Sequence, residues 1–381
     1  MNILISRSVK PKEYMKITDT DVYALHQPID RTVGDQRLEV TDVYWIVVEL
    51  ETDEGYTGTG WMGSLGFAPD MMLRLTESQF LDPLIGADPF ATEAIKEDLR
   101  VRSVYYGELG LSAWPRGAID VALWDIKAQA SEQPLYKLLG GSTDELPAYV
   151  SSMDSHHDLD ELSDLHGGYA DEGFTAFKTK VGSRSPSEEA DRIREIRETV
   201  GPDAEIFVDA NQAWTVTEAI ETTRAMNEYD VAWVEEPISE YDLDGHRRVA
   251  ESIDPPLATG EMLNRPEQFT RLLENGGMEL AQPDLIRSGG VTGQFHAAKL
   301  AADYNVPMAS HFYYSISAHV VSAAPTGMIV EYIPEYDIAP MLEEPPQIED
   351  GTVQLPDRPG HGYKIDPDAR AEHEVTFEEE P

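Results

Sequence analysis

The sequence predicts a closed parallel β/α barrel that follows an N-terminal α+β region. From about residue 145 to 332, apolar β-type runs alternate with helical periodicity, which is typical of parallel strands joined by right-handed crossovers. Eight such strands are predicted, enough to close a barrel. Charged side chains recur where the runs end, and Asp209, Glu235 and Glu261 follow one another at intervals of 26 positions. One strand, loop and helix occupy about that length of chain.

The α+β region is predicted over residues 1–140. A polar stretch over 29–37 has no periodicity and fits either a solvated loop or a lid. Asp53-Glu54-Gly55 predicts a hairpin turn. The expected strands are 2–10, 43–51 and 56–61, and the expected helices are 70–81, 90–101 and 118–128.

The barrel is predicted over residues 141–335, and the irregular segment 336–381 follows it. The expected strands are 146–150, 174–181, 205–209, 231–236, 257–261, 279–284, 306–311 and 327–332. The expected helices are 158–171, 187–199, 216–228, 243–252, 266–275, 291–304 and 315–323. One more strand over 351–355 is expected to pack back on the N-terminal region.

Composition excludes several classes of protein. There is no cysteine, so disulfides, thiolate catalysis and cysteine-bound metals are excluded. No run of 18 apolar residues predicts a membrane span. The first residues lack the pattern of a secretory signal, so a cytoplasmic location is expected.

The charge is strongly acidic, with 71 acidic against 29 basic residues and a net charge of −42. Nucleic-acid binding needs a basic footprint, and none is visible. The acidic residues are spread along the whole chain, which favours adaptation to high salt over an acidic interaction tail.

Asp209, Glu235 and Glu261 end three consecutive predicted strands. Active sites of such barrels lie at the carboxyl ends of the strands, where these side chains would converge. Three buried carboxylates need a compensating cation. Oxygen ligands suit a hard divalent ion, of which Mg²⁺ is the usual one.

Two further groups are suited to moving protons. Lys178 and Lys180 lie two positions apart on one strand, so they point the same way, and burial beside a metal is expected to lower their pKa. His311 ends the seventh strand and Asp284 the sixth, a pairing that would fix the imidazole tautomer. A metal with a base on each side indicates removal of the α-proton of a carboxylate through an enediolate intermediate.

Several motifs make the resemblance to a family specific when they are taken together. These motifs are Asp154-Ser155-His156, Lys178-Thr179-Lys180, Asp209-Ala210-Asn211, Glu235-Glu236-Pro237, Gly260-Glu261, Gln282-Pro283-Asp284, Gly289-Gly290-Val291, Ser310-His311-Phe312 and Ile316-Ser317-Ala318-His319. The chain resembles the mandelate racemase group of the enolase superfamily over nearly its full length. That resemblance implies a (β/α)₇β barrel under an N-terminal α+β capping domain.

The resemblance also implies roles for individual residues. Mg²⁺ would bind Asp209, Glu235 and Glu261, Lys180 would be the base on one face, and the His311–Asp284 dyad would act on the other. The substrate contacts implied by the resemblance are Lys178, a protonated Glu331, Asn211 and Ser155. A homo-oligomer, dimer or octamer, is a further expectation.

Two reactions on a small hydroxycarboxylate share this machinery. A racemase would use both bases on one carbon, whereas a sugar-acid dehydratase would use the dyad to expel the β-hydroxyl and give a 2-keto-3-deoxy acid. The polar lid, with Arg31 and Arg37 as expected substrate contacts, favours the dehydratase over a mandelate-type racemase. A catalytically inactive binding barrel is the alternative from another class, and the retention of every site residue disfavours it.

Overall fold

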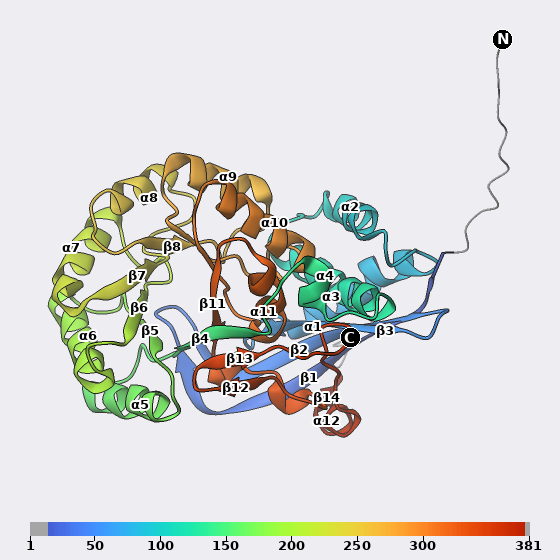
Figure 1. Cartoon of the computed structure of the whole chain (residues 1–381), viewed down its shortest axis with the longest axis horizontal. Helices are drawn as coiled ribbons and strands as arrows, with labels where there is room; N and C mark the ends of the chain where they lie inside the picture. Colours follow the sequence, from blue (N-terminus) through green and yellow to red (C-terminus); the bar gives the residue numbers. More distant parts are fainter. Residues whose placement is uncertain (1–13, 378–381) are drawn as a thin grey trace, which may run out of the picture.

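The computed structural model describes residues 14–377 and shows two joined parts, a sheet with helices on it and a ring of strands and helices (Figure 1). The strand predicted over 2–10 lies outside the described residues. No helix of the described chain is long and apolar enough to cross a membrane.

The N-terminal part contains an antiparallel sheet in the order β14-β1-β2-β3. Its strands and helices are β1 Ile17–Gly34, β2 Glu39–Thr52, β3 Thr57–Ser64, α1 Pro69–Leu75, α2 Thr92–Ser103, α3 Ala113–Ala130 and α4 Leu135–Leu139, with a π-helical turn Thr76–Leu81 and 3₁₀ turns Asp82–Leu84 and Gly110–Ser112. The α3 helix packs closely on β3, because a Cβ at Gly60 would lie 2.1 Å from the Ala118 carbonyl oxygen. Glycine therefore sets this contact.

The polar segment 29–37, which by its sequence fits either a solvated loop or a lid, is largely part of a strand. The strand β1 continues through it to Gly34, with a register shift between Pro28 and Val33. Pairing resumes because Val33 and Val40 lie opposite each other and both are buried. Only residues 35–38 form the turn between the strands, so the lid is the tip of a long β-ribbon.

The barrel is closed by pairing of β11 with β4, which gives eight parallel strands in the described chain. The strands are β4 Glu145–Ser151, β5 Ala176–Lys180, β6 Glu205–Asp209, β7 Val231–Glu235, β8 Leu257–Thr259, β9 Leu280–Ala281, β10 Met308–Ala309 and β11 Gly327–Tyr332. The helices outside them are α5 Leu159–Asp171, α6 Pro186–Val200, α7 Val216–Met226, α8 Leu243–Ala250, α9 Pro266–Asn275, α10 Gly290–Asp303 and α11 Tyr314–Ala323, with a 3₁₀ turn Asn227–Tyr229. This confirms the predicted architecture.

The C-terminal segment contacts both parts. It contains β12 Gln347–Glu349, β13 Thr352–Gln354, α12 Pro367–His373 and β14 Glu374–Val375, with 3₁₀ turns Pro334–Tyr336 and Ala339–Met341. The extra strand predicted over 351–355 does not pack on the N-terminal sheet, because β13 pairs antiparallel with β4 of the barrel. The later strand β14 joins β1 instead (Figure 1).

One apolar side chain from each barrel strand fills the lower interior of the barrel. These residues are Tyr149, Ala176, Phe207, Trp233, Ala258, Leu280, Ala309 and Ile329. Strand side chains repeat with a period of two, so the next inward positions are two residues further on. They include Lys178, Asp209, Glu235, His311 and Glu331. The polar side chains at the carboxyl ends of the strands, which form the mouth of the barrel, thus lie next to a packed apolar layer in the barrel interior.

Candidate active site

Three carboxylates come together at the mouth of the barrel. Asp209, Glu235 and Glu261 each offer an oxygen within 4.8 Å of the others, and all three side chains are buried. They end or follow β6, β7 and β8, as the strand spacing predicts. Glu261 Oε2 is buried without a hydrogen bond. An all-oxygen cluster of three carboxylates fits a hard divalent cation.

The contacts of this cluster shift the pKa of its members in different directions. Burial raises the pKa of Asp209, but Lys180 and Lys178 outweigh it and lower the pKa to about 2. Burial raises the pKa of Glu235 to about 7 despite the attraction of Lys178. Asp209 therefore binds a proton less tightly than Glu235, because both lysines stabilise the charge of Asp209 whereas only Lys178 acts on Glu235.

Lys178 and Lys180 lie within this layer as predicted. The expected lowering of their pKa concerns the metal-bound site; in the chain by itself both pKa values are raised. Lys178 Nζ lies 2.7 Å from Glu235 Oε1, and Lys180 Nζ lies 2.6 Å from Asp209 Oδ2. Burial alone would lower the pKa of each lysine. The carboxylates beside them outweigh burial and raise both pKa values.

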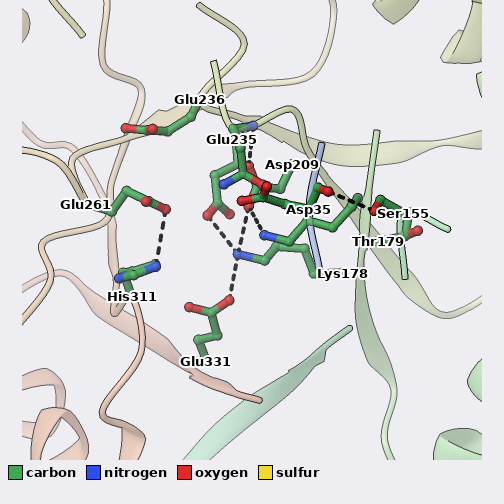
Figure 2. A network of polar contacts seen from close by, with 12 residues as sticks. Asp35, Ser155, Lys178, Thr179, Asp209, Glu235, Glu236, Glu261, His311 and Glu331 are labelled. Carbon is green, nitrogen blue, oxygen red and sulfur yellow. Dashed lines mark hydrogen bonds and ion pairs between the residues drawn. The ribbon is translucent and has the colours of Figure 1, made fainter. Parts of the chain in front are cut away.

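His311 and Asp284 form the predicted pair. His311 Nδ1 lies 2.8 Å from Asp284 Oδ2, so this bond fixes the orientation of the ring. The other ring nitrogen, Nε2, lies 3.2 Å from Glu261 Oε2. Burial lowers the pKa of His311, but the Glu261 charge and the Asp284 hydrogen bond raise it overall. Figure 2 shows His311 and Glu261 on one side of the cluster and Lys178 on the other.

Glu331 has a different state from the protonated donor that the resemblance implies. Its Oε1 lies 2.6 Å from Lys178 Nζ, and its Oε2 accepts the Phe312 N–H at 2.8 Å. Both oxygens therefore face donors. Burial raises the pKa of Glu331, but Lys178 and His311 lower it to about 2. The contacts make Glu331 an ionised partner of Lys178.

The residues expected to contact substrate from the lid and the first strand have other partners. The Ser155 hydroxyl lies 3.0 Å from the Gly34 carbonyl oxygen and 3.1 Å from that of Asp35. Arg37 Nη2 donates to the Gln212 carbonyl at 2.6 Å. Both side chains fasten the ribbon tip to the barrel, and neither lines the cavity described below. The Arg31 side chain lies outside the described structure.

A cavity of about 140 Å³ lies between the ribbon tip and the barrel mouth. Charged and polar side chains line its inner part: Asp35, Lys180, Asn211, Glu261, Asp284, Arg287, His311 and Glu331. Apolar and aromatic side chains line the rest, among them Leu38, Leu65, Phe67, Trp114, Met153, Phe312, Ile333 and Tyr336. The lid's contribution is thus less polar than its sequence suggests.

Sequence reasoning missed two of these groups, Arg287 and Tyr336, whereas Asp35 belongs to the polar lid that it had singled out. Arg287 Nη1 lies 3.1 Å from Glu261 Oε1, and its position three residues after Asp284 was the available signal. Asp35 accepts backbone N–H bonds from Arg37 and Leu38. Tyr336 follows the last barrel strand on a 3₁₀ turn, where no periodic pattern marks it. Its hydroxyl is buried without a hydrogen bond, as is the side-chain oxygen of Asn211.

Strained backbone follows the site residues. Asn211 and Glu236, which come just after Asp209 and Glu235, have φ angles of 41° and 38°. Phe312, just after His311, has a φ of 52°. Such conformations cost free energy for residues other than glycine and concentrate at functional sites.

Two family models cover most of the chain. The mandelate racemase / muconate lactonizing enzyme N-terminal domain matches residues 18–140, and the enolase C-terminal domain-like model matches residues 161–369. The chain belongs to the mandelate racemase/muconate lactonizing enzyme family of the enolase superfamily.

Relatives of this enolase-superfamily member include sugar-acid dehydratases and racemases. It is 31% identical to L-talarate/galactarate dehydratase of Salmonella typhimurium over 340 residues, which cover 89% of this chain and 85% of the relative. A racemase from Streptomyces coelicolor, crystallised with magnesium, has a TM-score of 0.90 at 29% identity and covers 94% of this chain and 100% of the racemase. A variant of L-talarate/galactarate dehydratase with magnesium and L-glucarate has a TM-score of 0.90 at 27% identity, covering 97% and 96%.

Proposed function

We propose that this enzyme removes the α-proton of a sugar acid and eliminates the β-hydroxyl to give a 2-keto-3-deoxy acid. The observation that carries this proposal is that Lys180, His311 and Glu261 border one cavity, and that Asp209 and Glu235 cluster with Glu261 beside it. The same proposal assigns Mg²⁺ to Asp209, Glu235 and Glu261, because three carboxylate oxygens within 4.8 Å of one another form a ligand set that suits a hard divalent ion. When bound, the ion supplies positive charge that stabilises the substrate's carboxylate as the α-proton leaves.

The chain's own residues would share the remaining steps. Lys180 Nζ takes the proton as the C2–H bond breaks, which leaves an enediolate. The C3–O bond then breaks, and His311 Nε2 gives its proton to the departing hydroxyl, so that water leaves. Asp284 holds the ring through Nδ1 for this transfer. The resulting enol takes up a proton at C3 and releases its C2 hydroxyl proton, which gives the 2-keto-3-deoxy acid.

Two buried polar atoms without hydrogen-bond partners support the proposal of a polyhydroxylated substrate. They are stronger evidence for it than the polar residues of the lid. The Asn211 side-chain oxygen and the Tyr336 hydroxyl are buried without partners and belong to residues that line the cavity. A buried polar atom without a partner costs about 1–3 kcal/mol. Substrate hydroxyls would satisfy these atoms, whereas a purely apolar side chain would not.

The test is a panel of sugar acids and simple 2-hydroxy acids incubated with enzyme and Mg²⁺. We expect at least one sugar acid to give a 2-keto product, detected as its semicarbazone. If no acid gave a keto product while a 2-hydroxy acid epimerised, the enzyme would be a racemase. Calorimetric titration of Mg²⁺ into wild type and Glu261→Gln tests the metal assignment without using activity.

The proposal also covers location and assembly. We propose a cytoplasmic homo-oligomer adapted to high salt, in keeping with the net charge of −42. Exposed apolar side chains on and after α2, including Val101, Val104 and Tyr105, support assembly of several copies. Light scattering after size-exclusion chromatography at high and low salt measures the assembly.

A further inference from the structure

A second cavity of about 250 Å³ lies between the capping domain and the barrel, beside the active site. Its cationic lining residues are Lys96, Arg100, Arg116, Arg265 and Arg287. Its carboxylates are Glu97, Glu108 and Glu267. Five cations against three carboxylates leave the lining with two positive charges in excess. The whole chain has 29 basic residues and a net charge of −42, so this cavity reverses the general charge pattern.

Two of the five cations are paired by the lining's own carboxylates. Glu108 bridges Arg100 and Arg265, with its two oxygens each 2.5 Å from a guanidinium nitrogen. Arg100 also contacts Glu97 at 2.7 Å, and Arg265 contacts Glu267 at 3.3 Å. Arg287 pairs with Glu261 in the active site. These contacts consume the three carboxylates and leave Lys96 and Arg116 without one.

Arg116 has only neutral acceptors. Its guanidinium donates to the Ser112 carbonyl at 2.9 Å and to the Glu108 carbonyl. No carboxylate lies within ion-pair distance of it among residues 14–377. Burial lowers the pKa of Arg116, although a guanidinium stays charged at neutral pH. A half-buried charge without a counterion is unfavourable.

Lys96 lies in an equally unfavourable place. A Cβ on Gly289 would be 3.9 Å from Lys96 Cε, so the lysine chain passes over the residue that caps α10. A helix carries partial positive charge at its N-terminus, which repels a cation. Within the described chain Lys96 has no ion pair or hydrogen bond. Its charge favours the ionised form of Asp120 from longer range, although burial still raises the pKa of Asp120 to about 6. The first two residues of α9 and the two residues just before α10 also border the cavity.

We propose that this cavity binds a small doubly charged oxyanion, a phosphate or a dicarboxylate, between Lys96 and Arg116. Such an anion would pair with Lys96 and Arg116, the two cations that have no carboxylate partner, and would face the N-terminus of α10. Lys96 and Arg116 belong to the capping domain, whereas Arg265 and Gly289 belong to the barrel. The anion would therefore hold the two domains together and stabilise the folded enzyme.

Inorganic phosphate and succinate are the probes, each titrated calorimetrically into the full chain at constant ionic strength set with sodium chloride. Constant ionic strength removes the general screening of a chain with charge −42. We expect one anion per chain. Lys96→Gln should weaken its binding by about 10-fold or more, because a charge-assisted contact is lost. Lys299→Gln, an exposed lysine on α10, is the matched control and should leave binding unchanged.

Thermal unfolding gives a second readout. Phosphate or succinate should raise the midpoint of wild type and of Lys299→Gln more than chloride does at equal ionic strength, and this difference should vanish in Lys96→Gln. Arg116→Gln should behave like Lys96→Gln if it folds. Tighter binding of phosphate would identify the natural ligand as a phosphate, and tighter binding of succinate would identify it as a dicarboxylate. Equal binding to Lys96→Gln and wild type, or no effect beyond that of chloride, would overturn the proposal.

Discussion

Two buried regions of this enzyme contain imidazoles and carboxylates, yet they differ in how their hydrogen bonds are used. At the junction of the capping domain and barrel, His319 Nδ1 accepts the Tyr136 N–H, and Nε2 lies 3.1 Å from the His361 carbonyl oxygen. His361 Nδ1 accepts the Tyr363 N–H, and Nε2 lies 2.8 Å from the Thr59 carbonyl oxygen. Every ring nitrogen in this pair has a partner.

The barrel mouth is buried to a similar degree but is not saturated. Glu261 Oε2, the Asn211 side-chain oxygen and the Tyr336 hydroxyl have no hydrogen bond. Their residues border a cavity, whereas the junction histidines do not line it. Burial and residue type alone do not separate the two regions. Unused hydrogen-bond capacity alone does not separate them either, because the Tyr363 hydroxyl at the junction is also buried without a hydrogen bond and borders another cavity. The mouth differs because its unpaired oxygens belong to residues that line the same cavity as Lys180 and His311, which marks it as the place for a ligand.

The largest effect is expected for the base at the mouth. Lys180→Met should reduce turnover by about 10³-fold, because a positioned general base contributes about 10² to 10⁴. Steady-state kinetics measure the loss, and circular dichroism checks the fold. Lys299→Met, on the outer helix α10, should keep full activity. Comparable turnover in Lys180→Met and wild type would remove Lys180 from the mechanism.

The second prediction compares one histidine from each region, His311 and His319, after the same substitution to glutamine. His311→Gln should lower turnover by about 10²-fold or more, because glutamine cannot give a proton to the leaving hydroxyl. His319→Gln should retain turnover, because glutamine can still accept and donate at the junction. Kinetics and urea unfolding of both variants provide the data. If His319→Gln lost activity as strongly as His311→Gln, the division between the regions would fail.

The junction should instead control the dependence of stability on pH. Burial and the nearby His361 together lower the pKa of His319 to about 3, whereas an unfolded histidine titrates near 6.5. Between these values the unfolded chain binds a proton that the folded chain does not, so stability falls as the pH drops through this window. From pH 7 to 5 the loss attributable to His319 is about 2 kcal/mol. Urea unfolding should show a shallower pH dependence in His319→Gln by that amount, and equal slopes would contradict the assignment.

The smallest effect concerns the unsatisfied hydroxyl at the mouth. Tyr336→Phe should raise KM about 5- to 10-fold, since a neutral hydrogen bond contributes about 1 kcal/mol. The free energy of unfolding should not fall, and should rise by up to about 1–3 kcal/mol, because the substitution removes a buried hydroxyl that has no partner in the protein. Kinetics with the preferred sugar acid and unfolding in urea measure both quantities. A loss of stability with an unchanged KM would make Tyr336 a packing residue.

The regular parts of the fold and site could be predicted because they repeat. Asp209, Glu235 and His311 lie at strand ends whose spacing is set by the β/α unit, and their inward direction follows from the period of two. This logic also brought Asp284 beside His311. The carboxylate cluster of Asp209, Glu235 and Glu261 could therefore be predicted from the spacing alone.

The remaining contacts depend on loops, where no period applies. Arg37 and Ser155 were expected to contact the substrate, but both hold the ribbon tip against the barrel. The position of that tip depends on the register shift after Pro28, which the sequence does not reveal. Tyr336 reaches the cavity from a 3₁₀ turn after the barrel. The ionised state of Glu331 depends on a 2.6 Å contact with Lys178, which only the three-dimensional structure reveals.

Exchange of the substrate's α-proton with deuterated water tests the central claim most directly. The experiment follows the C2 proton signal of the sugar acids and hydroxy acids of the panel by NMR, with Mg²⁺ and after chelation. We predict loss of the C2 proton, by exchange or elimination, in wild type with Mg²⁺, and none after chelation or in the Lys180→Met, His311→Gln double variant. Full retention of the C2 proton by every acid in the panel, or unchanged loss in the double variant, would contradict a proton-abstracting site at this barrel mouth.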